Sequence, residues 1–297
     1  MKFGIAGNLE KPVIAEVVES LLTRFEKEDV QYVLHDTLAR GLKKRKPSQL
    51  VRKSSTVSES GLAGACDILI SLGGDGTILR MARIVGKKRT PILGINVGKL
   101  GFLAEISVEE LDECLSEILA GRYHIEDRMV LQATSSKMKS DYFALNDVVM
   151  DLSSSSRMLS IETFVNGEFL STFTGDGMIV CTPTGSTGYA LSNGGPILSP
   201  SNRSMMISPI CPHALTVRPV VIPDDCVVTL KVQAAPGRVH VTTDGQPEVF
   251  LKPPLEVKVK RAGFTTRLVK RSNTSYFEVL RRKLHWGHDL RSSPSDM

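Results

Sequence analysis

Apolar residues follow two different spacings in the first third of the chain. Short apolar runs, at residues 2–6, 32–34, 67–72 and 91–95, alternate with segments in which apolar residues recur every three or four positions. The first spacing is typical of buried strands and the second of amphipathic helices, which we expect over residues 11–28, after Thr77 and over 108–119. Strands that alternate with helices in this way predict a parallel sheet covered on both faces, an α/β domain.

The pattern changes beyond Gly121. Runs rich in Val, Ile, Thr and Phe predict a succession of strands, punctuated by turn residues such as Asn166-Gly167 and Pro236-Gly237. Such a succession is typical of a mostly antiparallel β domain, and helical spacing returns only at residues 276–284. The expected strands are residues 130–133, 143–150, 159–165, 169–180, 227–232, 239–243 and 255–259.

These patterns predict two domains. We expect an α/β N-terminal domain with a parallel sheet over residues 1–122, and a mostly antiparallel β C-terminal domain over residues 123–274. The segment 275–297, with its helix, is expected to pack back on the first domain. A length of 297 residues agrees with this division, because a single hydrophobic core stops growing near that size.

Composition and charge narrow the class of protein. No stretch approaches the roughly 20 continuous apolar residues that a membrane span requires, and the first residues lack the pattern of a signal or transit peptide. We therefore expect a cytoplasmic protein. The five scattered cysteines, without a CxxC pair, predict neither a disulfide framework nor a zinc site. The mild net charge of +5 suits polyanionic small molecules better than nucleic acid.

One segment is much more basic than the rest. Residues 43–46 are all lysine or arginine, Arg52 and Lys53 follow, and the run is flanked by Pro47 and a serine-rich stretch at 54–60. This composition favours a solvated, mobile loop. The alternative is a flap that attracts phosphate.

The usual phosphate-binding motifs are absent, but a different glycine-rich segment takes their place. The chain has neither GxxxxGK[ST] nor GxGxxG. In residues 67–77, DILISLGGDGT, an apolar strand ends in Gly73-Gly74-Asp75-Gly76 directly before a helical pattern, with Thr77 placed to cap the helix. Bare backbone N–H groups at a helix N-terminus can receive an anion. An Asp-Gly hairpin turn is the alternative, which the helical spacing after Gly76 disfavours.

The chemical interpretation of this segment depends on Asp75. A carboxylate inside a loop that receives phosphate would repel the ligand, unless it holds a cation or accepts a proton from a hydroxyl group. Both options indicate phosphoryl transfer.

Two further polar segments interrupt the β-rich part. Residues 182–189, TPTGSTGY, interleave hydroxyls with glycines and precede the NGGP of 193–196, which suits ribose hydroxyls, an adenine edge or phosphates. A structural turn rich in Ser and Thr is the alternative. Asn146-Asp147 lies in the expected strand YFALNDVVM. Because buried polar groups must be hydrogen-bonded, this pair either satisfies itself in a core or faces a ligand.

Several other residues have plainer interpretations. His213, between Pro212 and an apolar residue, is interpreted as structural, and Asp244-Gly245 is typical of a hairpin turn. No further candidate metal ligand accompanies His285 and His288 in the sequence, so we assign no metal to them.

In their order along the chain, these motifs resemble those of the NAD kinase family, from about residue 67 to the YFEVLRRKLHWG segment. A GGDG loop alone also occurs in diacylglycerol and sphingosine kinases and in phosphofructokinases, but we see no counterpart there to TPTGST combined with an Asn-acid pair. The motifs that carry the resemblance are Gly73–Thr77, 94–105 (GINVGKLGFLAE), Asn146-Asp147, Asp176-Gly177 joined to TPTGSTGY and NGGP, Pro212-His213 with Arg218-Pro219, and Asp244-Gly245-Gln246.

The resemblance implies an enzyme that moves a phosphoryl group from ATP, or from polyphosphate, to the adenosine 2′-hydroxyl of NAD, giving NADP. Mg²⁺ or another divalent cation would arrive with ATP, and the chain would form a homodimer or homotetramer. Asp75 looks like the acid that orients the hydroxyl and accepts its proton, and Asp176 would lie near the nicotinamide end. The other residues expected to bind the dinucleotide or nucleotide are Gly73, Gly74, Gly76, Thr77, Asn146, Asp147, Thr184, Ser186, Thr187, Tyr189 and Gln246.

The sequence leaves two alternative functions open. A lipid kinase of the diacylglycerol or sphingosine type would need an apolar acceptor groove or an interfacial surface, and no amphipathic basic helix of that kind is evident. A non-catalytic dinucleotide sensor could use the same scaffold, but the intact Asp75 argues against it. We expect neither nucleic acid nor a membrane as a partner.

Overall fold

The computed structural model describes residues 1–45, 48–98, 101–152, 158–235, 237–246, 248–272 and 275–286. The chain divides into two compact units, each of which is described by itself. The first unit comprises residues 1–126 together with the chain from 267 onward, and the second comprises residues 127–266.

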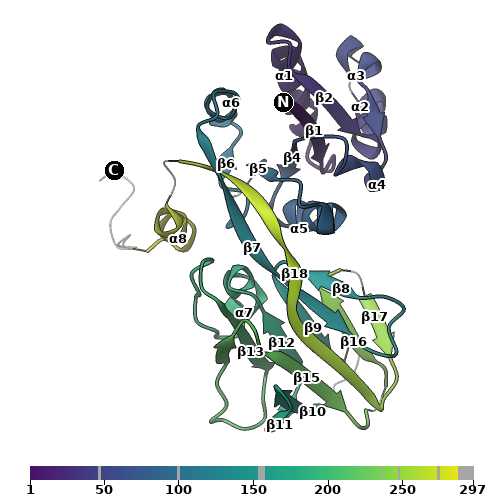
Figure 1. Ribbon diagram of the computed structural model, residues 1–297, viewed down its shortest axis with the longest axis vertical. Helices are drawn as coiled ribbons and strands as arrows, with labels where there is room; N and C mark the ends of the chain where they lie inside the picture. The colour runs from purple at the N-terminus through teal and green to yellow at the C-terminus, as the bar shows by residue number, and fades with distance from the viewer. Residues whose placement is uncertain are drawn as a thin grey trace. The chain divides into compact units, whose positions relative to one another are not determined.

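The first unit is built on a parallel sheet, as the alternating pattern predicts (Figure 1). Its strands pair in the order β3-β2-β1-β4-β5, β6 pairs with β5, and Leu268 near the end of β18 is parallel to Ile92 of β5. The elements are β1 (Lys2–Gly7), α1 (Ile14–Lys27), β2 (Gln31–His35), α2 (Asp36–Arg45), α3 (Gln49–Lys53), β3 (Thr56–Val57), α4 (Glu59–Leu62), β4 (Ile68–Gly73), α5 (Asp75–Val85), the 3₁₀ helix η1 (Gly86–Lys88), β5 (Ile92–Asn96), β6 (Ile106–Ser107), α6 (Leu111–Leu119) and α8 (Tyr276–Leu284).

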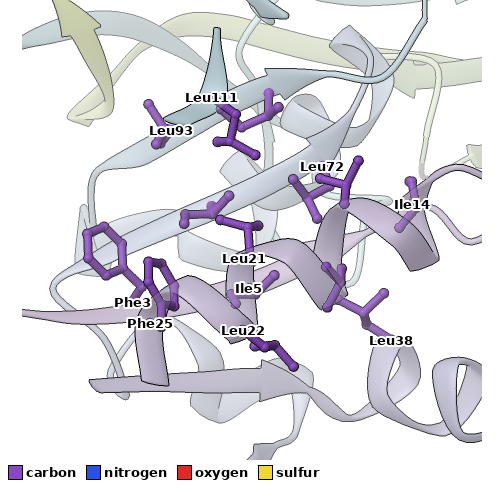
Figure 2. Packing of buried hydrophobic residues seen from close by; sticks show 14 of the residues in the cluster. Phe3, Ile5, Ile14, Leu21, Leu22, Phe25, Leu38, Leu72, Leu93 and Leu111 are labelled. Carbon is purple, nitrogen blue, oxygen red and sulfur yellow. The ribbon is translucent and has the colours of Figure 1, made fainter. Parts of the chain in front are cut away.

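Burial of apolar faces explains why these elements form. Along α1, Val17, Leu21 and Phe25 recur at helical spacing and are buried. Phe25 stacks on Phe3 of β1 with ring centroids 5.1 Å apart. Figure 2 shows these rings beside Ile5 in the core beneath the helix. The helix therefore depends on the sheet that it covers, because most helical stability in proteins comes from packing.

The prediction of a basic loop is wrong for the residues that the structure describes. Residues 43–45 form the last turn of α2, and Arg52 and Lys53 form the last turn of α3, whereas residues 46 and 47 lie outside the described part. Leu42 and Val51 are buried and anchor the two helices. Cations in the last turn of a helix complement its dipole, which is why a basic cluster here stabilises helix ends instead of preventing helix formation.

The second unit is mostly antiparallel β structure, as expected. One sheet has the order β14-β13-β12-β9-β16-β17, and a further antiparallel series runs β11-β10-β15-β18, with β7 pairing with β18 and β8. Buried apolar residues from both series form one cluster, so two layers share a core. The elements are β7 (Tyr123–Thr134), β8 (Tyr142–Ala144), β9 (Asp147–Asp151), β10 (Leu159–Val165), β11 (Glu168–Gly175), β12 (Gly177–Cys181), the 3₁₀ helix η2 (Thr184–Thr187), α7 (Tyr189–Ser192), β13 (Ser204–Ile210), β14 (Val220–Pro223), β15 (Val227–Val232), β16 (Val239–Thr243), β17 (Glu248–Leu251) and β18 (Leu255–Arg271).

Two expected strands are each divided in the structure, and both divisions fall at candidate site residues. Residues 143–150 form β8 and β9 with Asn146 between them, and residues 169–180 form β11 and β12 with Asp176 between them. The apolar spacing alone predicts one strand in each case, because a break of one or two residues hardly disturbs the spacing. The polar residues therefore lie at strand ends, where side chains can face a ligand.

Other strands of the structure differ from the prediction in number or in length. The strands β13, β14 and β17 were not expected, and β18 extends far beyond residue 259. The Asn166-Gly167 turn is confirmed by positive φ angles of 52° and 85°, whereas Pro236 lies outside the described residues. None of the described helices is long and apolar enough to cross a membrane.

Candidate active site

The glycine-rich segment connects β4 to α5 in the first unit. Gly73 ends the strand, Gly74 occupies the N-cap position and Asp75 is the first residue of the helix. The expectation that Thr77 caps this helix is wrong, because its N–H donates to the Gly74 carbonyl at 2.9 Å within the first turn. The helix begins three residues earlier than the sequence predicted, and the acidic Asp75 in its first turn complements the helix dipole.

The glycines of this loop are required for different reasons. A Cβ atom on Gly73 would lie 2.2 Å from Thr77 Oγ1, so packing within the protein excludes a side chain there. A Cβ atom on Gly74 or Gly76 would meet no atom within 4 Å. Gly74 has φ −112°, a conformation open to any residue. Neither packing nor backbone conformation demands glycine at 74, which points to space kept for a ligand.

Asp75 is held by three consecutive backbone N–H groups. Its Oδ2 accepts from Phe102 at 2.9 Å, and its Oδ1 accepts from Leu103 and Ala104, each at 3.0 Å. A Cβ atom on Gly101 would lie 1.9 Å from Asp75 Oδ1, so glycine permits this close approach. A carboxylate has about four acceptor positions. With three occupied, Oδ2 retains one for a further donor.

These contacts give a physical role to the GINVGKLGFLAE motif. Its residues 102–104 direct their N–H groups at Asp75 and fix the orientation of the carboxylate. Lys99 and Leu100 of the motif lie outside the described residues.

In the second unit, the structure brings two of the candidate motifs together. The Asn146 carbonyl accepts from the N–H of Thr182 at 2.8 Å, and Thr182 Oγ1 donates to the Leu145 carbonyl at 2.6 Å. A Cβ atom on Gly185 would lie 2.1 Å from the Asn146 carbonyl oxygen. The TPTGST segment therefore packs directly on the backbone of the Asn-acid pair.

Most hydroxyls of this segment are engaged within the protein. Ser186 Oγ donates to the Pro183 carbonyl at 2.6 Å, and Thr187 Oγ1 donates to the Thr184 carbonyl at 3.2 Å. Ser186 is fully buried, whereas Tyr189 is 47% exposed. The buried hydroxyls thus shape the turn, and Tyr189 offers an accessible ring.

The Asn-acid pair presents two polar groups without protein partners among the described residues. Asn146 Oδ1 is buried and accepts no hydrogen bond, and no hydrogen bond is made by the carboxyl group of Asp147. Burial, and secondarily the charge of Asp244, raise the pKa of Asp147 to about 7. The pair does not satisfy itself in a core, which favours the ligand-facing alternative.

The remaining candidates lie on exposed turns of the same unit. Asp176 and Gln246 are exposed, and the positive φ of Asp244 and Gly245 confirms the turn expected there. His213 is exposed, with its N–H bonded to the Thr174 carbonyl at 2.8 Å.

The sequence did not single out Arg128, which the structure places beside a candidate residue. Arg128 is only 3% exposed, and its Nη1 donates to Thr184 Oγ1 at 3.3 Å. A guanidinium group is almost never buried unless it is paired. The sequence feature that could have identified Arg128 is the position of a cation next to the apolar run of β7.

The contact at Gly185 leads to a testable expectation about stability. Gly185→Ala would place a methyl group against the backbone of Asn146, which has little room to move. We expect the free energy of unfolding to fall by about 1–3 kcal/mol, the usual cost of overpacking. Urea unfolding measures this, with Gly263→Ala as a control, because a Cβ atom at Gly263 meets nothing within 4 Å. Equal stabilities would contradict the tight packing.

Comparisons with known proteins show the family to which the chain is similar. The ATP-NAD kinase N-terminal domain matches residues 3–123, and the ATP-NAD kinase C-terminal domain matches residues 145–271. An NAD kinase of Bacteroides fragilis is 40% identical over 98% of this chain and 100% of its own length. An NAD kinase of Geotalea daltonii is 41% identical over 84% of this chain and 90% of its own.

Two solved structures are similar along most of the chain. Yeast NADH kinase complexed with NADH has a TM-score of 0.89 and 26% identity, over 99% of this chain and 90% of that one. An NAD kinase from Archaeoglobus fulgidus in complex with ATP has a TM-score of 0.76 and 25% identity, over 96% and 99%. With both domains matched and relatives about 40% identical over almost its full length, the chain belongs to the NAD kinase family.

Proposed function

We propose that the chain transfers a phosphoryl group from ATP to the adenosine 2′-hydroxyl of NAD, giving NADP, and that Asp75 orients and deprotonates this hydroxyl. The observation that supports the role of Asp75 most directly is its hydrogen bonding. Three backbone N–H groups fix the carboxylate and leave one acceptor position on Oδ2. A fixed acceptor is what phosphoryl transfer needs, because the hydroxyl must be positioned before its proton becomes acidic.

The loop beside Asp75 supplies donors for the transferring phosphoryl group. The N–H groups of Gly74 and Gly76 bond to no other described group, and both residues leave open space. The N–H of Thr77 is already bonded to Gly74, so Thr77 contributes no free backbone donor. Preorganised donors of this kind stabilise charge that develops in the transition state.

A divalent cation is proposed to accompany ATP and to neutralise charge on its phosphates. Among the described residues, no group of three His, Cys, Asp or Glu side chains could hold a metal ion. We propose that the phosphates of the donor are its ligands.

The Asn-acid pair and the TPTGST segment are proposed to hold the dinucleotide. The buried, unbonded Oδ1 of Asn146 supports this assignment, because such an atom costs free energy until a ligand or water pairs with it. From the family resemblance, we propose that the adenosine half lies against Asn146 and Asp147.

Asn146→Ala is expected to weaken binding more than turnover. The substitution removes an interaction common to the ground and transition states, so KM for NAD should rise about tenfold while kcat changes little. Steady-state kinetics at saturating ATP measure both constants. An unchanged KM would return Asn146 to a purely structural role.

A coupled assay tests the proposed reaction itself. The protein is incubated with NAD and ATP, and NADP is detected with an NADP-specific dehydrogenase. Replacing NAD by NADH, whose product would be NADPH, and ATP by polyphosphate, defines the acceptor and the donor. The failure of NADP and NADPH to form in every combination, with diacylglycerol or sphingosine phosphorylated instead, would support the lipid kinase alternative. We also propose a homodimer or homotetramer, which light scattering of the same preparation measures.

A further inference from the structure

Asp244 has a backbone conformation that few residues adopt. It follows β16 with φ +53°, and Gly245 follows with φ +70°. The N–H of Gln246 donates to the Thr243 carbonyl at 2.9 Å, which closes the turn. Two central residues with positive φ are the requirement of a type I′ turn, and aspartate tolerates this region better than most residues. The turn therefore aims the Asp244 side chain in a fixed direction.

The Asp244 carboxylate gathers three consecutive N–H groups of the Asn-acid segment. Its Oδ2 accepts from Leu145 at 2.8 Å, and its Oδ1 accepts from Asn146 at 2.7 Å and from Asp147 at 3.1 Å. The N–H of Asp244 in turn donates to the Asp147 carbonyl at 2.9 Å. Without the carboxylate, three backbone donors at the break between β8 and β9 would lose their partner.

The opposite side of the same segment is held by the TPTGST turn. The N–H of Thr182 bonds to the Asn146 carbonyl, and Thr182 Oγ1 bonds to the Leu145 carbonyl. Asp244 thus fixes the N–H side of the segment and Thr182 fixes the carbonyl side. No hydrogen bond from the part of the chain that the structure describes reaches the two side-chain groups that carry the proposed binding, Asn146 Oδ1 and the carboxyl of Asp147.

We propose that Asp244 is a positioning residue for dinucleotide binding, whose carboxylate fixes the backbone of residues 145–147 and thereby directs the side chains of Asn146 and Asp147 toward the ligand. The proposal rests on the proposed function for its ligand. The hydrogen-bond geometry that supports it does not depend on that function.

The charge of Asp244 also affects the pKa of Asp147. Asp147 is only 6% exposed, and its pKa is raised to about 7, first by burial and then by the charge of Asp244. Among the described residues, two other titratable groups interact with Asp147, the Cys181 thiol of β12 and the Tyr189 hydroxyl of α7. Both have raised pKa values, mainly because of burial. Removing the charge at 244 would therefore lower the pKa of Asp147.

The test uses Asp244→Asn and Asp244→Glu in the full-length protein. Asparagine keeps the size of the side chain but offers one acceptor oxygen and no charge, and glutamate keeps the charge but displaces it. Asp225→Asn is the matched control, because Asp225 is exposed in the same unit and its side chain forms no hydrogen bond or ion pair with another described residue. The three measurements are amide hydrogen exchange at residues 145–147, NAD affinity by titration calorimetry, and KM and kcat across pH.

For both Asp244 variants we expect exchange at residues 145–147 to accelerate at least about tenfold, the equivalent of one lost hydrogen bond to a charged group. NAD affinity should fall by a similar factor while kcat changes less, and for Asp244→Asn the inflection in the pH dependence of KM should move to lower pH. The Asp225 control should match the wild type in all three measurements.

Each contrary outcome has its own meaning. Wild-type exchange at residues 145–147 in both variants would overturn the positioning role, whatever the enzyme does with NAD. Faster exchange with unchanged NAD affinity would also overturn it, because the segment would then not position a binding group. If the wild-type protein itself neither bound NAD nor formed NADP, the proposed function would fail while the exchange result still reported on Asp244.

Discussion

Asp75→Asn is expected to reduce kcat by about 10² to 10⁴, the usual cost of losing a general base. The amide cannot take up the hydroxyl proton at neutral pH, although it has nearly the size of the carboxylate. Affinity for NAD should hold or improve, because a negative charge near two polyphosphates is removed. The measurements are the coupled NADP assay and NAD titration calorimetry on the same preparation.

The structure adds a complication that the sequence did not reveal. Asparagine at 75 has one acceptor oxygen, so at most two of the three N–H groups of residues 102–104 keep their partner. Amide exchange at residues 102–104 therefore has to accompany the kinetics. Asp67→Asn serves as a control, because Asp67 Oδ2 also accepts a backbone N–H, from Lys2 at 2.7 Å, in the same unit.

The outcomes separate three roles for Asp75. Normal turnover would show that the carboxylate is only structural, and loss of NAD binding together with activity would make it a substrate anchor. A large loss of kcat with NAD affinity retained, beside a normal Asp67→Asn control, supports the proposed base. If residues 102–104 exchange much faster as well, part of the loss belongs to the loop that orients the carboxylate.

Where the apolar pattern is long and periodic, the sequence predicts the fold closely. The strand 67–72 and the helix 276–284 correspond to β4 and α8 almost residue for residue. All residues of β4 are buried, whereas α8 buries only Val279 and Leu280. The parallel sheet and the antiparallel β unit follow from the same periodicity. The GGDG loop was found because its glycines stand between a strand pattern and a helix pattern.

What the sequence did not predict depends on contacts between distant segments. Asp75 receives its hydrogen bonds from residues 102–104, and Asn146 is held by Asp244, almost a hundred residues away. No local pattern encodes such pairings. Likewise, polar residues such as Asn146 mark a strand end only when the neighbouring strands are known, and the basic end of α2 shows that charge alone does not predict a loop.

Gly74→Val tests whether the loop receives phosphate. Gly74 has φ −112° and ψ −168°, an extended conformation that valine adopts readily, and its Cβ would meet no protein atom within 4 Å. The protein should therefore fold, with a loss of roughly 1 kcal/mol because valine is a poor N-cap residue. Any larger effect must come from what occupies the open space during the reaction.

In the proposed mechanism that occupant is the transferring phosphoryl group. A branched side chain at 74 would keep phosphate from the N–H groups of Gly74 and Gly76, and removing one such donor typically costs about 10² to 10³ in kcat. We expect a loss of at least that size in the coupled assay, with NAD affinity nearly unchanged. Gly263→Val is the control, since its Cβ also meets nothing within 4 Å on an exposed strand position, and it should keep wild-type activity. Wild-type turnover by a folded Gly74→Val protein would show that phosphate does not approach this backbone, and the helix N-terminus would then have to be excluded as the phosphate site.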